Sequence, residues 1–246
     1  MLTLLSSSIL ATAKLHNLEN PKQFIKITAG KSVDAPGQNI TKLCYLYHDY
    51  VVIEINDPAI MGASSLKIYP INPKVNFSSL CKVIINQGYA YEINSKNSGL
   101  YGYYRGKYAN FILISGPDSF GVGSPFQIFS ISKQGYKLIL ADWQANSEPF
   151  RFLTTQGKTI GVNYWRVVDS DCSLWVGDGN VCWQKILRDN NIKQKLLRPQ
   201  CSKEYRRDKS PLDNPTQILL HVEISDLSKP LVRNITEEKT KCYPRP

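Results

Sequence analysis

The sequence lacks most of the short motifs that mark a catalytic centre. It contains no G-x-S-x-G nucleophile elbow, no H-E-x-x-H metal motif, no P-loop and no G-x-G-x-x-G dinucleotide fingerprint. Three histidines leave few possible members for a histidine-dependent triad. The sequence therefore specifies no reaction and no cofactor, and a binding protein is favoured over an enzyme, which stays the alternative.

The histidines themselves are expected to be ordinary strand residues. His48 precedes Asp49 in a predicted strand, where neighbouring side chains point to opposite faces, so the two are not expected to act together. His221 shares a predicted strand face with Glu223, which makes a pair of these two geometrically possible.

Long apolar runs are absent as well. No stretch after the first 13 residues reaches 18 consecutive apolar residues, so we expect no transmembrane span. Hydrophobic residues make up 42% and charged residues 20%, which is typical of a folded protein. The length of 246 residues allows one large domain or two small ones. We predict one β-rich domain over residues 14–246, with a basic insertion at residues 185–209.

The first 13 residues carry no charged side chain and resemble part of a signal peptide. They are apolar with small residues and close on Ala11-Thr12-Ala13, the small-x-small pattern of a signal-peptidase site. The basic segment that starts a signal peptide is missing, which suggests that the true start codon lies upstream. We expect an exported protein, periplasmic or extracellular.

The six cysteines fit this compartment. They show no C-x-x-C and no paired Cys/His spacing, which argues against zinc and thioredoxin-type sites. An even number behind a signal-like start predicts disulfides. Proximity in the chain favours Cys44–Cys81, with the other four pairing among themselves. The disulfide candidates are Cys44, Cys81, Cys172, Cys182, Cys201 and Cys242.

Alternating apolar residues predict a mainly β fold, an antiparallel meander of propeller-like or sandwich type. Gly- and Pro-containing breakers separate the segments. The predicted strands are 43–56 (one long strand or two), 65–71, 81–86, 108–115, 125–131, 136–142, 150–154, 159–168 and 217–225. One short helix is predicted near 183–197, where Trp183 and Leu187 can share a face.

An internal repeat is also indicated. Residues 51–71 align without gaps on residues 111–131, so that Ile68 meets Ile128. Each copy reads as a strand, a loop and a second strand, as in a propeller blade or a stacked meander. Any two hairpins of an all-β protein offer a simpler explanation, and both stay open.

Two clusters of residues are candidates for a binding site. The first cluster surrounds the predicted turn Gly177-Asp178-Gly179-Asn180, and its possible oxygen ligands are Asp169, Asp171, Asp178 and Asn180. Their spacing does not match a calcium-binding loop, and an Asp-Gly pair is typical of a tight hairpin turn without metal. We therefore predict no metal. The second cluster consists of the tyrosines between residues 89 and 108. Tyr101, Tyr103 and Tyr104 could form an aromatic binding surface, or they could be ordinary strand residues with no role in binding.

Positive charge gathers in one segment. Residues 185–209 hold nine basic and three acidic side chains, a net +6 out of +10 for the chain. The basic residues are Lys185, Arg188, Lys193, Lys195, Arg198, Lys203, Arg206, Arg207 and Lys209. Such a segment can bind an anionic glycan, an anionic lipid surface or an acidic protein. Nucleic acid is less expected, because an exported protein rarely meets it.

We therefore predict a non-enzymatic binding or interaction domain with a basic surface. The alternative is a secreted carboxylate-dependent hydrolase such as a glycosidase, which needs two facing acids. Asp142, Glu148, Glu92 and Asp178 are available for it, and nothing in the sequence pairs them.

Several short motifs resemble a group of uncharacterised exported bacterial proteins. They are Gly106-Lys107-Tyr108, Gly116-Pro117-Asp118, Phe126-Gln-Ile-Phe129, Asn163-Tyr164-Trp165, Cys172, Ile224-Ser-Asp226-Leu227 and Cys242. The resemblance covers roughly residues 100–246 and implies a periplasmic or secreted β-rich domain of unknown function, without catalytic residues. The basic insertion at 185–209 and the Cys44/Cys81 pair depart from the pattern.

Overall fold

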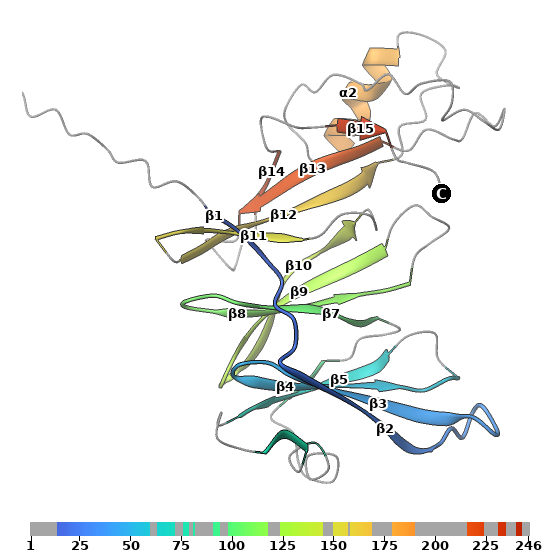
Figure 1. Cartoon of the computed structure of the whole chain (residues 1–246). Coiled ribbons are helices and arrows are strands. Elements are labelled where there is room, and N and C mark those ends of the chain that lie inside the picture. Colours follow the sequence, from blue (N-terminus) through green and yellow to red (C-terminus); the bar gives the residue numbers. More distant parts are fainter. Residues whose placement is uncertain are drawn as a thin grey trace, which may run out of the picture.

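Three antiparallel sheets lie one above another in the computed structural model (Figure 1). This confirms the predicted mainly β, antiparallel class with a short helix. The structure describes residues 14–59, 63–71, 76–78, 81, 91–93, 98–117, 124–144, 150–156, 158–168, 179–189, 216–223, 231–234 and 240–242.

Each sheet contains one four-stranded meander, in which every strand pairs with the next along the chain. The first meander comprises β3 (Asn39–Leu46), β4 (Tyr50–Asn56), β5 (Ala63–Pro70) and β6 (Tyr91–Ile93). The second comprises β7 (Gly99–Arg105), β8 (Asn110–Ser115), β9 (Ser124–Ser132) and β10 (Gly135–Gln144). The third comprises β11 (Arg151–Thr155), β12 (Lys158–Val168), β13 (Thr216–Glu223) and β14 (Leu231–Asn234), and β15 (Thr240–Cys242) also pairs with β13.

The segment before the first meander crosses all three sheets. β1 (Lys14–Asn17) pairs with β11, Glu19 forms an isolated antiparallel bridge with Tyr103 of β7, and β2 (Gln23–Lys31) pairs with β3. We call residues 14–31 the strap. Figure 1 shows it in dark blue, running from the third sheet past the second to the first. It therefore meets the first strand of every meander.

Apolar side chains fill the two spaces between the sheets. Between the first and second sheets, Val52 and Ile68 meet Ile112 and Ile114. Between the second and third sheets, aromatic rings dominate, and Tyr104 stacks on Phe152 with 4.2 Å between ring centroids. The middle strand β8 faces both spaces, so Phe111 to Ile114 are all buried. This explains why its sequence is continuously apolar instead of alternating.

The helix begins earlier than the sequence predicts. α2 spans Gly179–Asp189, whereas the predicted span was 183–197, of which residues 190–197 lie outside the described part. The predicted hairpin turn is wrong at Gly179 and Asn180, which begin the helix. Trp183 and Leu187 are one helical turn apart and join the core between the second and third sheets. Burial of this pair stabilises the helix that begins at Gly179, because packing of one helix face supplies most helical stability in proteins.

The predicted repeat corresponds to two equivalent hairpins, β4–β5 and β8–β9, each formed by the middle strands of its meander. Val52 pairs with Ile68, but Ile112 pairs with Phe129 instead of Ile128. The ungapped alignment is therefore wrong by one residue, because the second hairpin has one residue more between its paired strands.

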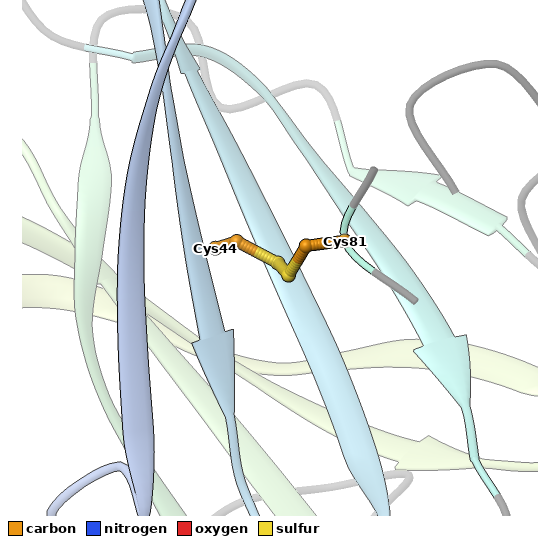
Figure 2. Close-up of a disulfide and its surroundings, with 2 residues drawn as sticks. All are labelled: Cys44 and Cys81. Carbon is orange, nitrogen blue, oxygen red and sulfur yellow. A yellow bond between two sulfur atoms is a disulfide. The ribbon is translucent and has the colours of Figure 1, made fainter. Parts of the chain in front are cut away.

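A disulfide joins Cys44 and Cys81, as the sequence predicts (Figure 2). Both cysteines are buried on the outer face of the first sheet, beside Val51, Ile53 and Phe77. Cys81 is helical, so the strand predicted to begin there is wrong at that residue. Cys172 and Cys201 lie outside the described residues, as do the side chains of Cys182 and Cys242, and their pairing stays a prediction.

Candidate binding surface at the hairpin tips

The first turn of each meander lies at the same end of the stack. The first two turns are residues 47–49 and 106–109, and the third follows β11 at Gln156; each lies between the first and second strands of its meander. Arg105 Nε lies 3.2 Å from Asp49 Oδ2, which joins the first turn to the second. Tyr108 and Gln156 line one hollow, which joins the second turn to the third.

The turn between β9 and β10 lies at this end as well. Asn110 at the start of β8 is paired with Ile131, so the turn at Ser132–Gly135 follows directly. Lys133 therefore stands on the same end of the second sheet as Lys107. We call these residues the hairpin-tip surface: 47–49, 105–109, 132–135, Thr155, Gln156 and Lys158.

The hollow between the second and third turns has a volume of about 500 Å³. Its lining residues are Tyr108, Thr155, Gln156, Lys158 and Ile160. Tyr108 is 69% exposed, and Lys107 Nζ lies 5.1 Å from the centroid of its ring. The residues that line the hollow thus include one with an aromatic ring, one with a hydroxyl, one with an amide and one with an ammonium group.

Gly106 allows the two turns to approach each other. Its N–H donates to the carbonyl of Ala109 at 2.9 Å and closes the tip of the second meander. A Cβ at this position would lie 2.5 Å from that carbonyl oxygen and 2.8 Å from Thr159 Oγ1. Only glycine fits without a shift of backbone, so this residue fixes the spacing of the hollow.

The exposed charges at this end are mainly positive. Among the described residues of this surface, the exposed cations are Arg105, Lys107, Lys133 and Lys158, and the carboxylate is that of Asp49, which already faces Arg105. Glu19 of the strap adds a negative charge near Tyr47. Such an excess of cations on one surface attracts anionic ligands, and salt weakens the attraction.

His48 and Asp49 correct one expectation of the sequence. They lie in the turn between β3 and β4, not within a strand, and His48 Nδ1 lies 2.7 Å from Asp49 Oδ1. The strict alternation of strand side chains does not hold in a turn, so neighbouring side chains can meet. Asp49 is thereby held between His48 and Arg105. The side chains of His221 and Glu223 lie outside the described part.

The three tyrosines of the predicted aromatic surface lie in different places. Tyr103 is buried between the first and second sheets, and Tyr104 between the second and third. Burial raises the pKa of Tyr103, and nearby carboxylates such as Asp49 raise it further. Tyr101 reaches the surface, with its ring edge-on to Phe150. Of the dense tyrosine segment, it is Tyr108 that reaches the hollow.

The predicted basic segment is described only at its start. Lys185 and Arg188 are exposed on α2, which Figure 1 shows above the third sheet. Its other basic residues, Lys193, Lys195, Arg198, Lys203, Arg206, Arg207 and Lys209, lie outside the described residues. Their role stays a prediction.

The acids offered for a hydrolase are not brought together in the described part. Asp142 accepts a hydrogen bond from Tyr164 and faces Arg166, whose Nη2 lies 3.3 Å away. Glu92 lies on β6 of another sheet, and Glu148 and Asp178 lie outside the described residues. Among the described residues there is also no group of three histidines, cysteines or acids that could hold a metal.

The sequence did not single out the hairpin-tip surface. Its lysines come from three separate turns, so no run of charge marks them in the chain. The signal available was the repeated placement of lysine in turn sequences, G-K-Y, S-K-Q-G and T-Q-G-K.

Comparison of the chain with protein-family models, with curated proteins and with solved structures gives no match. Across the described ranges, no helix is long and apolar enough to cross a membrane. The resemblance to exported bacterial proteins stays a prediction. Function is therefore inferred from the hairpin-tip surface itself.

Proposed function

We propose that the protein is a non-enzymatic, exported domain that binds an anionic glycan at the hairpin-tip surface. The observation that supports this most is the hollow that combines the ring of Tyr108 with Lys158, beside Lys107. Within the described part, none of the residues that line the hollow carries a carboxylate, which favours binding over carboxylate-dependent hydrolysis.

Each group of the hollow matches one part of a charged sugar. The apolar face of a sugar ring can stack on Tyr108, as rings do in other aromatic sites. The hydroxyl of Thr155 and the amide of Gln156 can exchange hydrogen bonds with sugar hydroxyls. Lys158 and Lys107 can pair with a carboxylate or sulfate group. The volume of about 500 Å³ lies in the range of small-ligand sites.

The test is a binding titration with sulfated and carboxylated oligosaccharides, with uncharged oligosaccharides of the same length as the comparison. We expect binding only to the charged set, weakening steeply as salt rises. Reversing both lysines, Lys107→Glu with Lys158→Glu, should weaken binding at least tenfold. Tyr108→Ala should cost about 1 kcal/mol, which is roughly a fivefold loss.

Lys31→Glu is the matched control. Lys31 is an exposed lysine of β2 that is paired with Asn39, at the end of the first sheet away from the tips. It changes the net charge as much as one of the two tip reversals does, so it is compared with Lys107→Glu and Lys158→Glu made singly, and equal effects would indicate a general charge effect. Loss of binding only on reversal of residues 193–209 would move the site to the basic segment. Tighter binding to single-stranded nucleic acid would overturn the choice of a glycan.

Export is a separate part of the proposal and rests on residues 1–13. We expect mass mapping of the secreted protein to find Lys14 as the first residue. The same experiment without reducing agent should show Cys44 linked to Cys81 and four further cysteines without free thiols. An intact Met1 in the cell interior would contradict export and leave the hairpin-tip proposal to its own test.

A further inference from the structure

β10 forms an edge of the second sheet. The sheet order is β10-β9-β8-β7, and the opposite edge strand β7 is bridged by Glu19 of the strap. Among the described residues, β10 pairs with β9 and with no second strand. An edge strand presents unpaired N–H and C=O groups, which another extended chain can pair with.

The first half of this edge is exposed on both of its faces. Tyr136 is 43% exposed and Leu138 45%, while Lys137 between them is exposed on the opposite face. In β8, which lies two strands away in the same sheet, four consecutive side chains are by contrast buried. The ring of Tyr136 is held edge-on against Phe129, with 5.8 Å between centroids. Two large apolar groups thus stand in fixed positions beside an open backbone edge.

The local charge selects the kind of partner. Lys137 and Lys133 are exposed along this half of the edge. The acid further along the strand, Asp142, is already engaged by Arg166 and Tyr164. The charge left to a partner is therefore positive. A second copy of the chain fits poorly, because pairing of two β10 edges would bring lysines together on chains that each carry +10.

We propose that an extended acidic segment of a partner protein adds to β10 as a fifth strand of the second sheet. Two apolar side chains of the segment lie opposite Tyr136 and Leu138, and an acidic side chain between them lies opposite Lys137. Main-chain hydrogen bonds supply affinity, and the alternating side chains supply specificity. The irregular register between Leu138 and Leu140 interrupts the regular part of the strand, so the matching sequence is short.

The probe is a fluorescein-labelled synthetic peptide, Thr-Val-Glu-Val-Glu-Val-Thr, titrated with the full chain and followed by fluorescence anisotropy. Lys137→Glu should weaken its binding at least tenfold and create binding of the peptide in which both Glu residues are Lys. Leu138→Thr should weaken it several-fold. Lys26→Glu, on the exposed edge strand β2 of the first sheet, should leave binding unchanged.

Two N-methylated peptides test the main-chain pairing directly. Methylating one alternate set of peptide N–H groups should abolish binding, and methylating the other set should not, because only one set faces the β10 edge. Equal binding of the two methylated peptides would overturn strand addition. Two other results would overturn the proposal. One is that the acidic peptide does not bind, and the other is that Lys26→Glu weakens its binding whereas Lys137→Glu does not.

Discussion

Replacing Asp142 with alanine tests how the second and third sheets are held together. Asp142 lies on β10 and receives the Tyr164 hydroxyl and the Arg166 guanidinium, both from β12. The Asp142 side chain is 11% exposed and that of Arg166 is 23% exposed, so water screens this contact little. Burial raises the pKa of Tyr164, and Asp142 raises it further, so the hydroxyl stays a donor at neutral pH.

The expected magnitudes follow from what each variant leaves behind. Asp142→Ala leaves a buried hydroxyl and a largely buried guanidinium without their partner, which costs about 3–5 kcal/mol. Tyr164→Phe removes one hydrogen bond to a charged group and keeps the Arg166 contact, which costs about 1.5–3 kcal/mol. The double variant should cost less than the sum of the two, by about 1–2 kcal/mol, because both remove the same hydrogen bond.

The assay is urea unfolding followed by tryptophan fluorescence and circular dichroism, with coincidence of the two probes checked. The control is Asp49→Ala, the same substitution at an ion pair that is 39% exposed. Solvent screening limits its cost to about 1 kcal/mol or less. The reasoning is refuted if Asp142→Ala costs no more than the Asp49 control, or if the costs at Asp142 and Tyr164 simply add.

Three further predictions concern the disulfide, alkaline pH and the hairpin tips. Cys44→Ser with Cys81→Ser should lower the free energy of unfolding by about 4 kcal/mol in the chain-entropy view, measured by urea unfolding; a change under 1 kcal/mol would contradict it. Burial raises the pKa of Tyr47 and Tyr103, so the unfolded chain loses these protons first and stability should fall as pH rises above about 10. Absorbance at 295 nm should show both ionising only with loss of the near-ultraviolet circular dichroism signal, and early ionisation in the intact fold would refute their burial. Gly106→Ala should cost about 1–3 kcal/mol and weaken glycan binding, since a Cβ there meets backbone; calorimetry and titration check both.

Strands that face a core on one or both sides could be predicted from the sequence. Val51-Val52-Ile53 and Phe111 to Ile114 are continuous apolar runs, and each run is buried in the structure. The cores also account for Tyr103 and Tyr104, for which the sequence leaves a binding surface open beside ordinary strand positions. Adjacent strand residues face opposite sides, and here both sides are covered by neighbouring sheets. A sequence does not reveal that a third sheet covers the second.

The strap and the hairpin-tip surface could not be predicted, for a common physical reason. β1 has four exposed residues and no apolar alternation, and it forms because β11 supplies its partner. The lysines of the hairpin tips lie in turns or, as Lys158 does, at the start of the strand that follows, and their positions relative to one another depend on the stacking of three meanders. Both features depend on contacts between distant parts of the chain, and such contacts leave no local pattern.

The strap makes the three meanders into one stack. Its contacts run in reverse order, since β1 meets the third sheet and β2 meets the first. Lys14 is paired with Thr154, so β1 can form only after the chain has been made as far as the third meander. His16 Nε2 lies 2.9 Å from Thr154 Oγ1, which adds one side-chain contact to a short exposed strand. Each meander can form by pairing of strands that are close in the chain. Pairing of β1 with β11 instead closes a loop of more than 100 residues, and this costs conformational entropy before the new contacts compensate for it. The strap is therefore expected to close last in folding.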